Sequence, residues 1–140
     1  MGEYSWRMDP GLNNVGSYQV SGKPYATGSI DAKHGSRPGG FEIVFPYVSR
    51  WFKVINNDTG NSCKVGFSVS GMTGSANYFT VAAAIAAAGT VDSGPLELKV
   101  SSIWVSGSTD VDVVAGLTWI PTIRTNTDSG ANWSGSSGVG

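Results

Sequence analysis

Short segments with strand-like patterning recur between residues 41 and 121 of this chain. Period-two alternation, or enrichment in β-branched and aromatic residues, marks seven of them: 41–45, 51–55, 64–70, 77–81, 96–100, 103–105 and 110–120. Successive side chains of a strand point to opposite faces, so the alternation predicts strands with one buried side. Clusters of turn-forming residues separate the segments, the densest being NNDTGN at 56–61. Seven or eight short strands separated by turns fit a sandwich or a barrel, and strand–helix alternation, the mark of a parallel sheet, is absent from the sequence. We predict an all-β antiparallel sandwich.

The apolar residues of these segments are expected to face one another across the sandwich. Burial of such side chains is the main favourable contribution to folding, and a chain of 140 residues is long enough to bury a sizeable core. The predicted core residues are Ile43, Phe45, Phe52, Phe67, Val69, Phe79, Leu96, Leu98, Val113 and Leu117.

The regions that flank these segments have a different composition. Glycine and proline recur through residues 1–40 and argue against any long regular element there. The same region carries too many aromatic and aliphatic residues for a solvated tail. We therefore predict an extended N-terminal arm over 1–40, a sandwich domain over 41–122, and a Gly/Ser-rich C-terminal tail over 123–140.

Aromatic residues in the arm and the tail lie away from the predicted core. Tyr4, Trp6, Tyr18 and Tyr25 belong to the arm, and Trp133 belongs to the tail. Large aromatic side chains are the usual anchors of protein interfaces. These five residues are our predicted interface residues, buried against a neighbouring molecule.

The other three tryptophans lie within predicted strands. Trp51, Trp104 and Trp119 are flanked by apolar residues, which favours a place in the core. An exposed set of tryptophans would instead form a platform on which sugars or bases stack. The core is the better prediction for these three.

The segment Val81–Ala88 (VAAAIAAA) does not fit the strand pattern. Alanine favours helix, but eight residues are too short for an isolated helix. Two alternatives stay open, a single helical turn or a connection of small residues across the sheet. This longest apolar run is also far shorter than the about 20 residues of a membrane span, so no membrane insertion is expected.

Composition excludes several classes of function. Charged residues make up 14% of the chain, against about 25% in typical soluble domains, and the formal net charge is −1. Nucleic-acid binding needs a basic surface, which this balance does not supply. One cysteine and one histidine cannot build a disulfide framework or a multi-cysteine zinc site. Phosphate-binding glycine motifs are absent from the sequence.

Two weaker constellations also have structural explanations. Cys63 and His34 would form a nucleophile and base only with a third group to orient them, and a packed thiol with a solvated imidazole is the simpler interpretation. Asp110 and Asp112 lie on one face of a strand and could bind calcium, with Asp92 or Asp128 as further ligands. A solvent-facing strand accounts for the same spacing. We predict no catalytic residues, no cofactor and no metal site.

Three blocks of the sequence are informative together: 14–25 (NVGSYQVSGKPY), 45–51 (FPYVSRW) and 115–122 (AGLTWIPT). They resemble small single jelly-roll capsid proteins of tailless double-stranded DNA viruses, among which the vertex (penton) proteins are the nearest class. The resemblance implies an antiparallel eight-stranded sandwich with the topology of a single jelly roll, homopentamers at capsid vertices, and arms that reach neighbouring capsid proteins. The alanine-rich segment departs from it.

The function expected from these observations is structural, and the chain is not expected to be an enzyme. We predict a virion protein that assembles inside the host cell into a homo-oligomeric, pentameric capsid vertex and contacts neighbouring capsid proteins through its arm. The alternative is a carbohydrate-binding or capsid-decoration and receptor-binding β-sandwich module. Fold alone does not choose between them.

Overall fold

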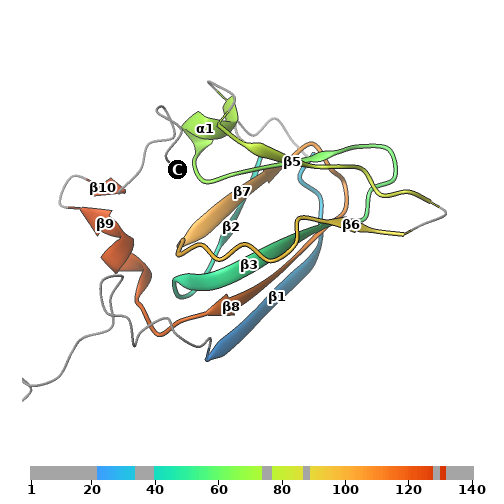
Figure 1. Cartoon of the computed structure of the whole chain (residues 1–140). Helices are drawn as coiled ribbons and strands as arrows, with labels where there is room; N and C mark the ends of the chain where they lie inside the picture. The colour runs from blue at the N-terminus through green and yellow to red at the C-terminus, as the bar shows by residue number, and fades with distance from the viewer. Residues whose placement is uncertain (1–21, 34–39, 74–76, 87–88, 128–129, 132–140) are drawn as a thin grey trace, which may run out of the picture.

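The computed structural model describes residues 22–33, 40–73, 77–86, 89–127 and 130–131 of the chain. Two four-stranded antiparallel sheets lie face to face and enclose the core (Figure 1). The predicted all-β antiparallel sandwich is therefore confirmed.

Each sheet combines strands that are far apart in the sequence. Sheet A has the strand order β1 (Lys23–Ile30), β8 (Val111–Leu117), β3 (Ser49–Asn56) and β6 (Val91–Asp92). Sheet B has the order β2 (Phe41–Val44), β7 (Ser102–Ser106), β4 (Cys63–Gly66) and β5 (Phe79–Val81). The smaller elements are α1 (Val69–Thr73), the 3-10 turn η2 (Thr122–Thr125), and the paired short strands β9 (Asn126–Thr127) and β10 (Gly130–Ala131).

The sandwich has two distinct ends. Strands β1, β3, β5 and β7 end, and strands β2, β4, β6 and β8 begin, at one end of the sandwich, which we call the loop end (Figure 1). Gly22, before β1, and residues 118–121, after β8, lie at the other, which we call the terminal end. At the terminal end Gly22 N donates to the Leu117 carbonyl at 3.2 Å, and Val48 N donates to the Ile120 carbonyl at 3.0 Å.

Half of the predicted core residues are fully buried between the sheets. Ile43, Phe45, Phe52, Val113 and Leu117 are each at most 3% exposed. Three more, Phe67, Phe79 and Leu96, are partly buried and pack against this core.

The core prediction is wrong for Val69 and Leu98, which are 37% and 40% exposed. Each error comes from a strand that the chain does not form. Val69 begins the short helix α1, because the Ser68 hydroxyl caps it and accepts a hydrogen bond from Gly71 N at 3.0 Å. The predicted strand over 64–70 therefore ends early, as β4 at Gly66.

Leu98 lies in the segment 96–100, which alternates like a strand but forms only an isolated bridge from Leu96 to Phe52. Between the backbone hydrogen bonds at Leu96 and the one from Ser49 N to the Val100 carbonyl at 2.9 Å, the Ser49 hydroxyl binds the segment as well. It donates to the Leu98 carbonyl at 2.6 Å and accepts from Val100 N at 3.1 Å. The segment therefore follows β3 without its side chains alternating into the core.

The prediction of an extended arm is also wrong for Lys23–Ile30. These eight residues form β1 and pair with β8, so the sandwich begins about twenty residues earlier than predicted. Pro24 is tolerated in β1 because β1 is an edge strand. The pairing of β1 with β8 shifts register between Thr27 and Ile30. Residues 1–21 lie outside the described part of the chain.

The alanine-rich segment connects the two sheets. Val81 ends β5 in sheet B, and the chain reaches β6 in sheet A through a hairpin closed by a bridge between Ile85 and Gly89. The described part of this segment contains no helical turn. Of the two alternatives left open by the sequence, the connection of small residues is the one observed.

Candidate functional surface

The outer face of sheet A is unusually apolar for a sheet surface. Side chains that alternate with the buried ones on β1, β8 and β3 point away from the core. The outward-facing residues are Pro24, Ala26, Gly28, Trp51, Lys53, Ile55, Asp112, Val114 and Gly116. Lys53 and Asp112 are the charged members of this set, and the exposed Asp92 on the edge strand β6, opposite Ile55, is a third charged residue of this face. An exposed sheet face in water normally carries polar side chains, so this face is a candidate docking surface.

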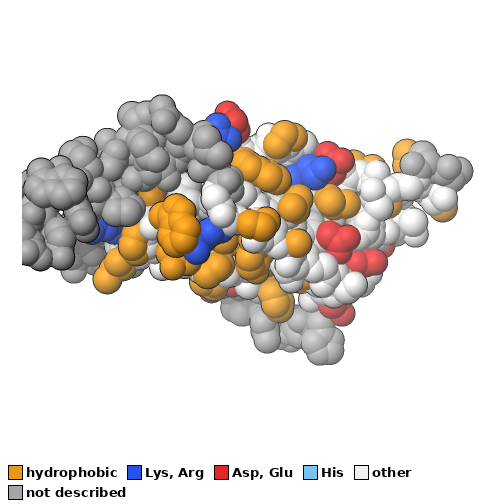
Figure 2. All heavy atoms as spheres, turned by 90° about the horizontal axis from the view of Figure 1, so that it is seen from below, with side chains coloured by type: hydrophobic (Ala, Val, Ile, Leu, Met, Phe, Trp, Pro, Cys, Tyr) orange, Lys and Arg blue, Asp and Glu red, His pale blue; other side chains and the backbone are white. Residues whose placement is uncertain are grey.

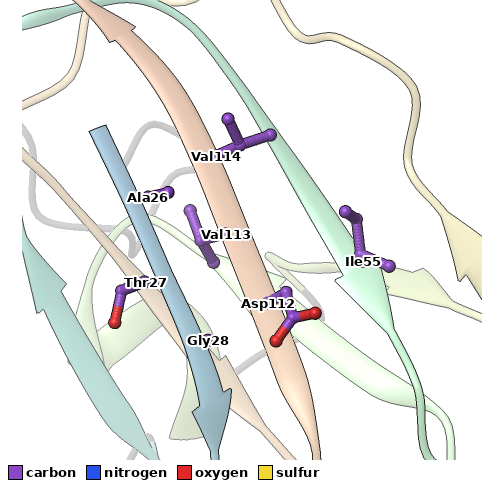
Figure 3. Close-up of a pocket in the computed structure, with 7 residues that line it drawn as sticks. All are labelled: Ala26, Thr27, Gly28, Ile55, Asp112, Val113 and Val114. Carbon is purple, nitrogen blue, oxygen red and sulfur yellow. The ribbon is translucent and has the colours of Figure 1, made fainter. Parts of the chain in front are cut away.

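A shallow groove of about 370 Å³ crosses this face (Figure 3). Its lining residues are Ala26, Thr27, Gly28, Ile55, Asp112, Val113 and Val114. Ala26 and Gly28 are small, so the surface is low at β1, whereas Val114 and Ile55 rise beside it on β8 and β3. The hollow follows from this difference in side-chain size between neighbouring strands.

Charge is unevenly distributed along the molecule. Figure 2 views the molecule from the side on which β1 and β8 lie, and hydrophobic side chains gather across its middle and left. Acidic side chains gather at the right, where Figure 1 places the loop end. Asp58 and Asp110 belong to loops at this end, and Asp112 lies near the start of β8.

The loop end is held together by one buried amide. Asn56 is fully buried, and its Nδ2 donates to the carbonyls of Asn61 at 2.9 Å and Ala82 at 3.0 Å. Its Oδ1 accepts from Ser108 Oγ at 2.8 Å and from Asp58 N at 3.1 Å. A single side chain at the end of β3 thus ties together three neighbouring loops.

The Asp58 carboxylate joins the β3–β4 loop to the β7–β8 loop. It accepts hydrogen bonds from Thr109 N at 3.0 Å, Asn61 Nδ2 at 2.9 Å, Gly60 N at 2.8 Å and Thr109 Oγ1 at 2.8 Å. These donors favour the charged form, the Thr109 amide most of all, and hold the pKa of Asp58 well below its usual value of 3.8. The carboxylate therefore serves a structural purpose in this loop.

The carboxylates of Asp110, in the loop before β8, and Asp112, in β8, share one donor. The prediction that both lie within one strand is therefore wrong for Asp110. Asn57 Nδ2 lies 2.9 Å from Asp112 Oδ2 and 3.4 Å from Asp110 Oδ1. Asp112 Oδ1 also accepts from Ser29 N at 2.9 Å. Among the described residues there is no group of three or more His, Cys, Asp or Glu side chains placed to hold a metal ion. The calcium alternative therefore has no cluster to support it within this part of the chain.

Cys63 is fully buried at the start of β4. Burial raises the pKa of its thiol to about 11, so the thiolate that a nucleophile needs is disfavoured. The simpler interpretation of a packed thiol fits this environment. His34, the other member of the possible dyad, lies outside the described residues.

A cluster of aromatic and cationic groups marks the terminal end. Lys23 Nζ lies 3.7 Å from the centroid of the Trp119 ring and 4.4 Å from that of Tyr47. The two rings meet edge to face at 6.1 Å. Trp119 is nevertheless 59% exposed, and Ile123 beyond it is exposed as well. Cation–π contacts of this kind hold the exposed indole in place.

The core prediction for the three strand tryptophans is therefore wrong. Trp119 follows the end of β8 and is exposed, because Thr118 and Ile120 on either side of it are the buried residues. Trp51 and Trp104 are half-buried and alternate with the core residues Phe52, Ile103 and Val105, which places them on the outer faces of sheets A and B. Flanking apolar residues did not distinguish the inner from the outer side of a strand.

Of the five predicted interface residues, Tyr25 alone lies in the described part of the chain. Its ring packs edge to face on Phe45, 5.2 Å between centroids, and it belongs to the margin of the chain's own core. Tyr4, Trp6, Tyr18 and Trp133 lie outside the described residues. The sequence analysis missed Ala26, Gly28 and the Lys23–Trp119 pair, although the alternation of Tyr25 and Thr27 within KPYATGSI was a signal for β1.

Comparisons with protein-family models, with curated proteins and with solved structures find no match for this chain. Within the described residues, no helix has the length and apolar character needed to cross a bilayer. The fold and the surfaces described above define the chain as an antiparallel β-sandwich with an apolar outer face on one sheet.

Proposed function

We propose that this chain is a structural virion protein that forms a homopentameric capsid vertex. The observation that carries the proposal is the strand order, β1-β8-β3-β6 in one sheet and β2-β7-β4-β5 in the other. This order supports a single jelly roll, an architecture used by viral capsid proteins and by lectins.

The pairing of the strands explains why this order supports a jelly roll. Strand β1 pairs with β8, β2 with β7, β3 with β6 and β4 with β5. The chain is therefore paired like one long hairpin with its tip between β4 and β5. Successive pairs of this hairpin alternate between the two sheets, so the hairpin is wrapped around the core.

The surface chemistry supports self-association. The outer face of sheet A combines small and apolar residues, and an exposed apolar face of this kind is usually covered by another molecule. A net charge of −1 opposes the approach of identical copies only weakly. A ring of identical subunits covers such a face without needing a second protein.

We further propose that residues before Gly22 contact neighbouring capsid proteins in the virion. The described chain begins at the terminal end, beside the exposed Trp119, so a preceding segment starts from a surface where aromatic groups already lie. Since β1 is part of the sandwich, the test is a deletion of residues 2–21 that leaves β1 intact. The truncated chain should fold and form pentamers but enter particles poorly, and normal incorporation would contradict this part of the proposal.

The experiment that tests the central proposal is native mass spectrometry of the purified full-length chain at tens of micromolar. A complex of five copies of the 14.5 kDa chain is the expected result. A monomer at this concentration would contradict a self-assembling vertex protein.

The exposed Trp119 favours a second candidate function, a carbohydrate-binding or decoration module. An indole held at the surface by Lys23 and Tyr47 offers a flat apolar face to a sugar ring. A glycan array probed with the wild type and with Trp119→Ala tests this candidate. A glycan bound by the wild type and lost in the variant would favour the module, whereas no binding by either would leave the vertex proposal preferred.

A further inference from the structure

The β5–β6 hairpin presents an apolar projection at the loop end. Its tip is closed by reciprocal backbone hydrogen bonds, from Ile85 N to the Gly89 carbonyl at 3.1 Å and from Gly89 N to the Ile85 carbonyl at 2.7 Å. Ile85 is 60% exposed, and the sequence carries no charged residue from 77 to 91. Within the described part of the chain Ile85 therefore stays largely uncovered, which makes the tip a candidate contact.

The base of this hairpin is fixed to the body of the sandwich. Ala84 N donates to the Asp58 carbonyl at 2.8 Å, and the Ala82 carbonyl accepts from the buried Asn56 amide. Ile85, one residue beyond Ala84, is therefore held close to the body of the sandwich. A surface element that is already ordered loses little conformational entropy when it binds.

The sheet A groove has the chemistry to receive such a tip. Its walls are Ile55 and Val114, and its floor contains Ala26 and Gly28 (Figure 3). The Asp112 carboxylate lies directly over Gly28, so the room for an inserted side chain is over Ala26. Asp112 is the one charged residue in the lining, and it already accepts hydrogen bonds from Ser29 N and Asn57 Nδ2. Covering the groove with an uncharged segment therefore leaves this carboxylate with partners.

The positions of tip and groove suit contact between neighbouring copies. The hairpin joins β5 and β6, which are edge strands of sheets B and A, whereas the groove lies on β1, β8 and β3, toward the opposite edge of sheet A. Both features lie toward the loop end, since Gly28, Ile55 and Asp112 are near the loop ends of their strands. Copies set side by side in one orientation would bring the β6 edge of one to the β1 edge of the next.

We propose that the hairpin tip around Ile85 of one copy docks in the sheet A groove of the next copy around a closed ring. Two different surfaces of the same chain meet in this contact. Repeated head to tail with a rotation that closes, it builds a ring, whereas two reciprocal contacts of this kind would build a two-fold dimer. The number of copies in the largest cross-linked species distinguishes the two. The inference rests on the proposed homo-oligomer and names the surfaces that build it.

Disulfide cross-linking of the full-length chain tests this contact. The double variant Ala26→Cys/Ile85→Cys is oxidised and separated on a denaturing gel, with each single variant and Thr80→Cys/Ile85→Cys as controls. A ladder of covalent oligomers that ends at five copies, seen in the Ala26/Ile85 pair alone, is the expected result. Cys63 is fully buried and does not compete for the cross-link.

Three other outcomes overturn the proposed contact. Pentamers in native mass spectrometry without a cross-link between positions 26 and 85 would contradict the contact and leave the proposed function standing. Covalent dimers from Ala26→Cys alone would show that like faces meet. Monomers of the wild-type chain at tens of micromolar would contradict both the contact and the proposed function.

A charge at the tip provides a second, independent measurement. Ile85→Asp should raise the concentration at which the oligomer dissociates by about tenfold or more, because a carboxylate would be buried in the groove. Ile123→Asp is the matched control, since Ile123 is also exposed but lies at the terminal end. An equal effect of both variants, at unchanged circular dichroism, would overturn the assignment of the tip.

Discussion

The two sheets of the sandwich have similar inner faces and different outer faces. Both inner faces are lined by buried aromatic and aliphatic side chains. The outward residues of sheet B are mostly polar: Glu42, Lys64, Thr80, Ser102 and Ser106, with Val44, Gly66 and Trp104 as small or apolar exceptions. The outward residues of sheet A are mostly small or apolar, and the sheet A groove runs among them.

The difference between the outer faces distinguishes residues needed for folding from residues available for association. A core between two sheets requires one apolar face from each, and both sheets provide it. An additional apolar face contributes nothing to the fold of a single copy, because it stays in contact with water until another molecule covers it. The outer face of sheet A is therefore where an interaction with another molecule is expected, and that of sheet B has the polarity of a solvated surface.

The largest effect on folding is expected from the inner face of sheet A. Phe52 is fully buried and contacts both Phe45 and Phe67 through its ring. Phe52→Ala should lower the free energy of unfolding by about 3–5 kcal/mol, because it removes buried apolar contacts and leaves a cavity. Lys53→Ala, one residue further on the outer face, should change it by less than about 0.5 kcal/mol. Urea unfolding at one fixed protein concentration measures both, and similar losses would contradict the assignment of the two faces.

A smaller loss is expected at the loop end, where polar rather than apolar contacts hold the structure. Asn56→Ala should lower the free energy of unfolding by about 1–3 kcal/mol, because the Ala82 carbonyl loses its amide donor and the buried Ser108 hydroxyl loses its shortest hydrogen bond. Thr59→Ala in the same loop is exposed and serves as the control. Thermal unfolding of the two variants decides the question, and an unaffected Asn56→Ala protein would mean that water replaces the amide.

The Asp58 loop should make stability depend on pH. The pKa of Asp58 is lowered in the folded chain, so the carboxylate stabilises the fold above its unfolded pKa of 3.8. This contribution is lost as the pH falls below about 4, since the unfolded chain then binds the proton more readily. Asp58→Asn should weaken the acid-induced loss of stability, measured as the urea midpoint at pH 7 and at successively lower pH. An identical pH profile for the variant would contradict the prediction.

The core and most strands could be predicted from the sequence because both depend on local alternation. Ile43, Phe45 and Phe52 are bulky apolar residues in segments whose neighbours are turns, and local pattern is sufficient for them. Strand β1 was missed because Ala26 and Gly28 face outward where a polar residue would mark the alternation. The same small residues form the floor of the groove, so the feature that hid the strand also built the candidate docking surface.

The remaining errors have their cause in contacts that are distant in sequence. Ser49 occupies the hydrogen-bonding groups of Leu98 and Val100 from 49 and 51 residues away, and no local pattern reveals this. Trp119 is exposed because the strand alternation stops after β8. There the Thr118 hydroxyl donates a hydrogen bond to the Val48 carbonyl, 70 residues away in sequence. Which outer face is apolar depends on strand register, which the sequence pattern alone does not determine.

A matched pair of charges on the two outer faces measures most directly whether sheet A is the association surface. Ala26→Glu places a carboxylate on β1, and Thr80→Glu places one on β5; both residues are exposed on edge strands, so each change should cost less than about 0.5 kcal/mol in folding. In native mass spectrometry, Ala26→Glu should be largely monomeric at a concentration where the wild type and Thr80→Glu are pentamers. A pentameric Ala26→Glu protein beside a dissociated Thr80→Glu protein would contradict the assignment.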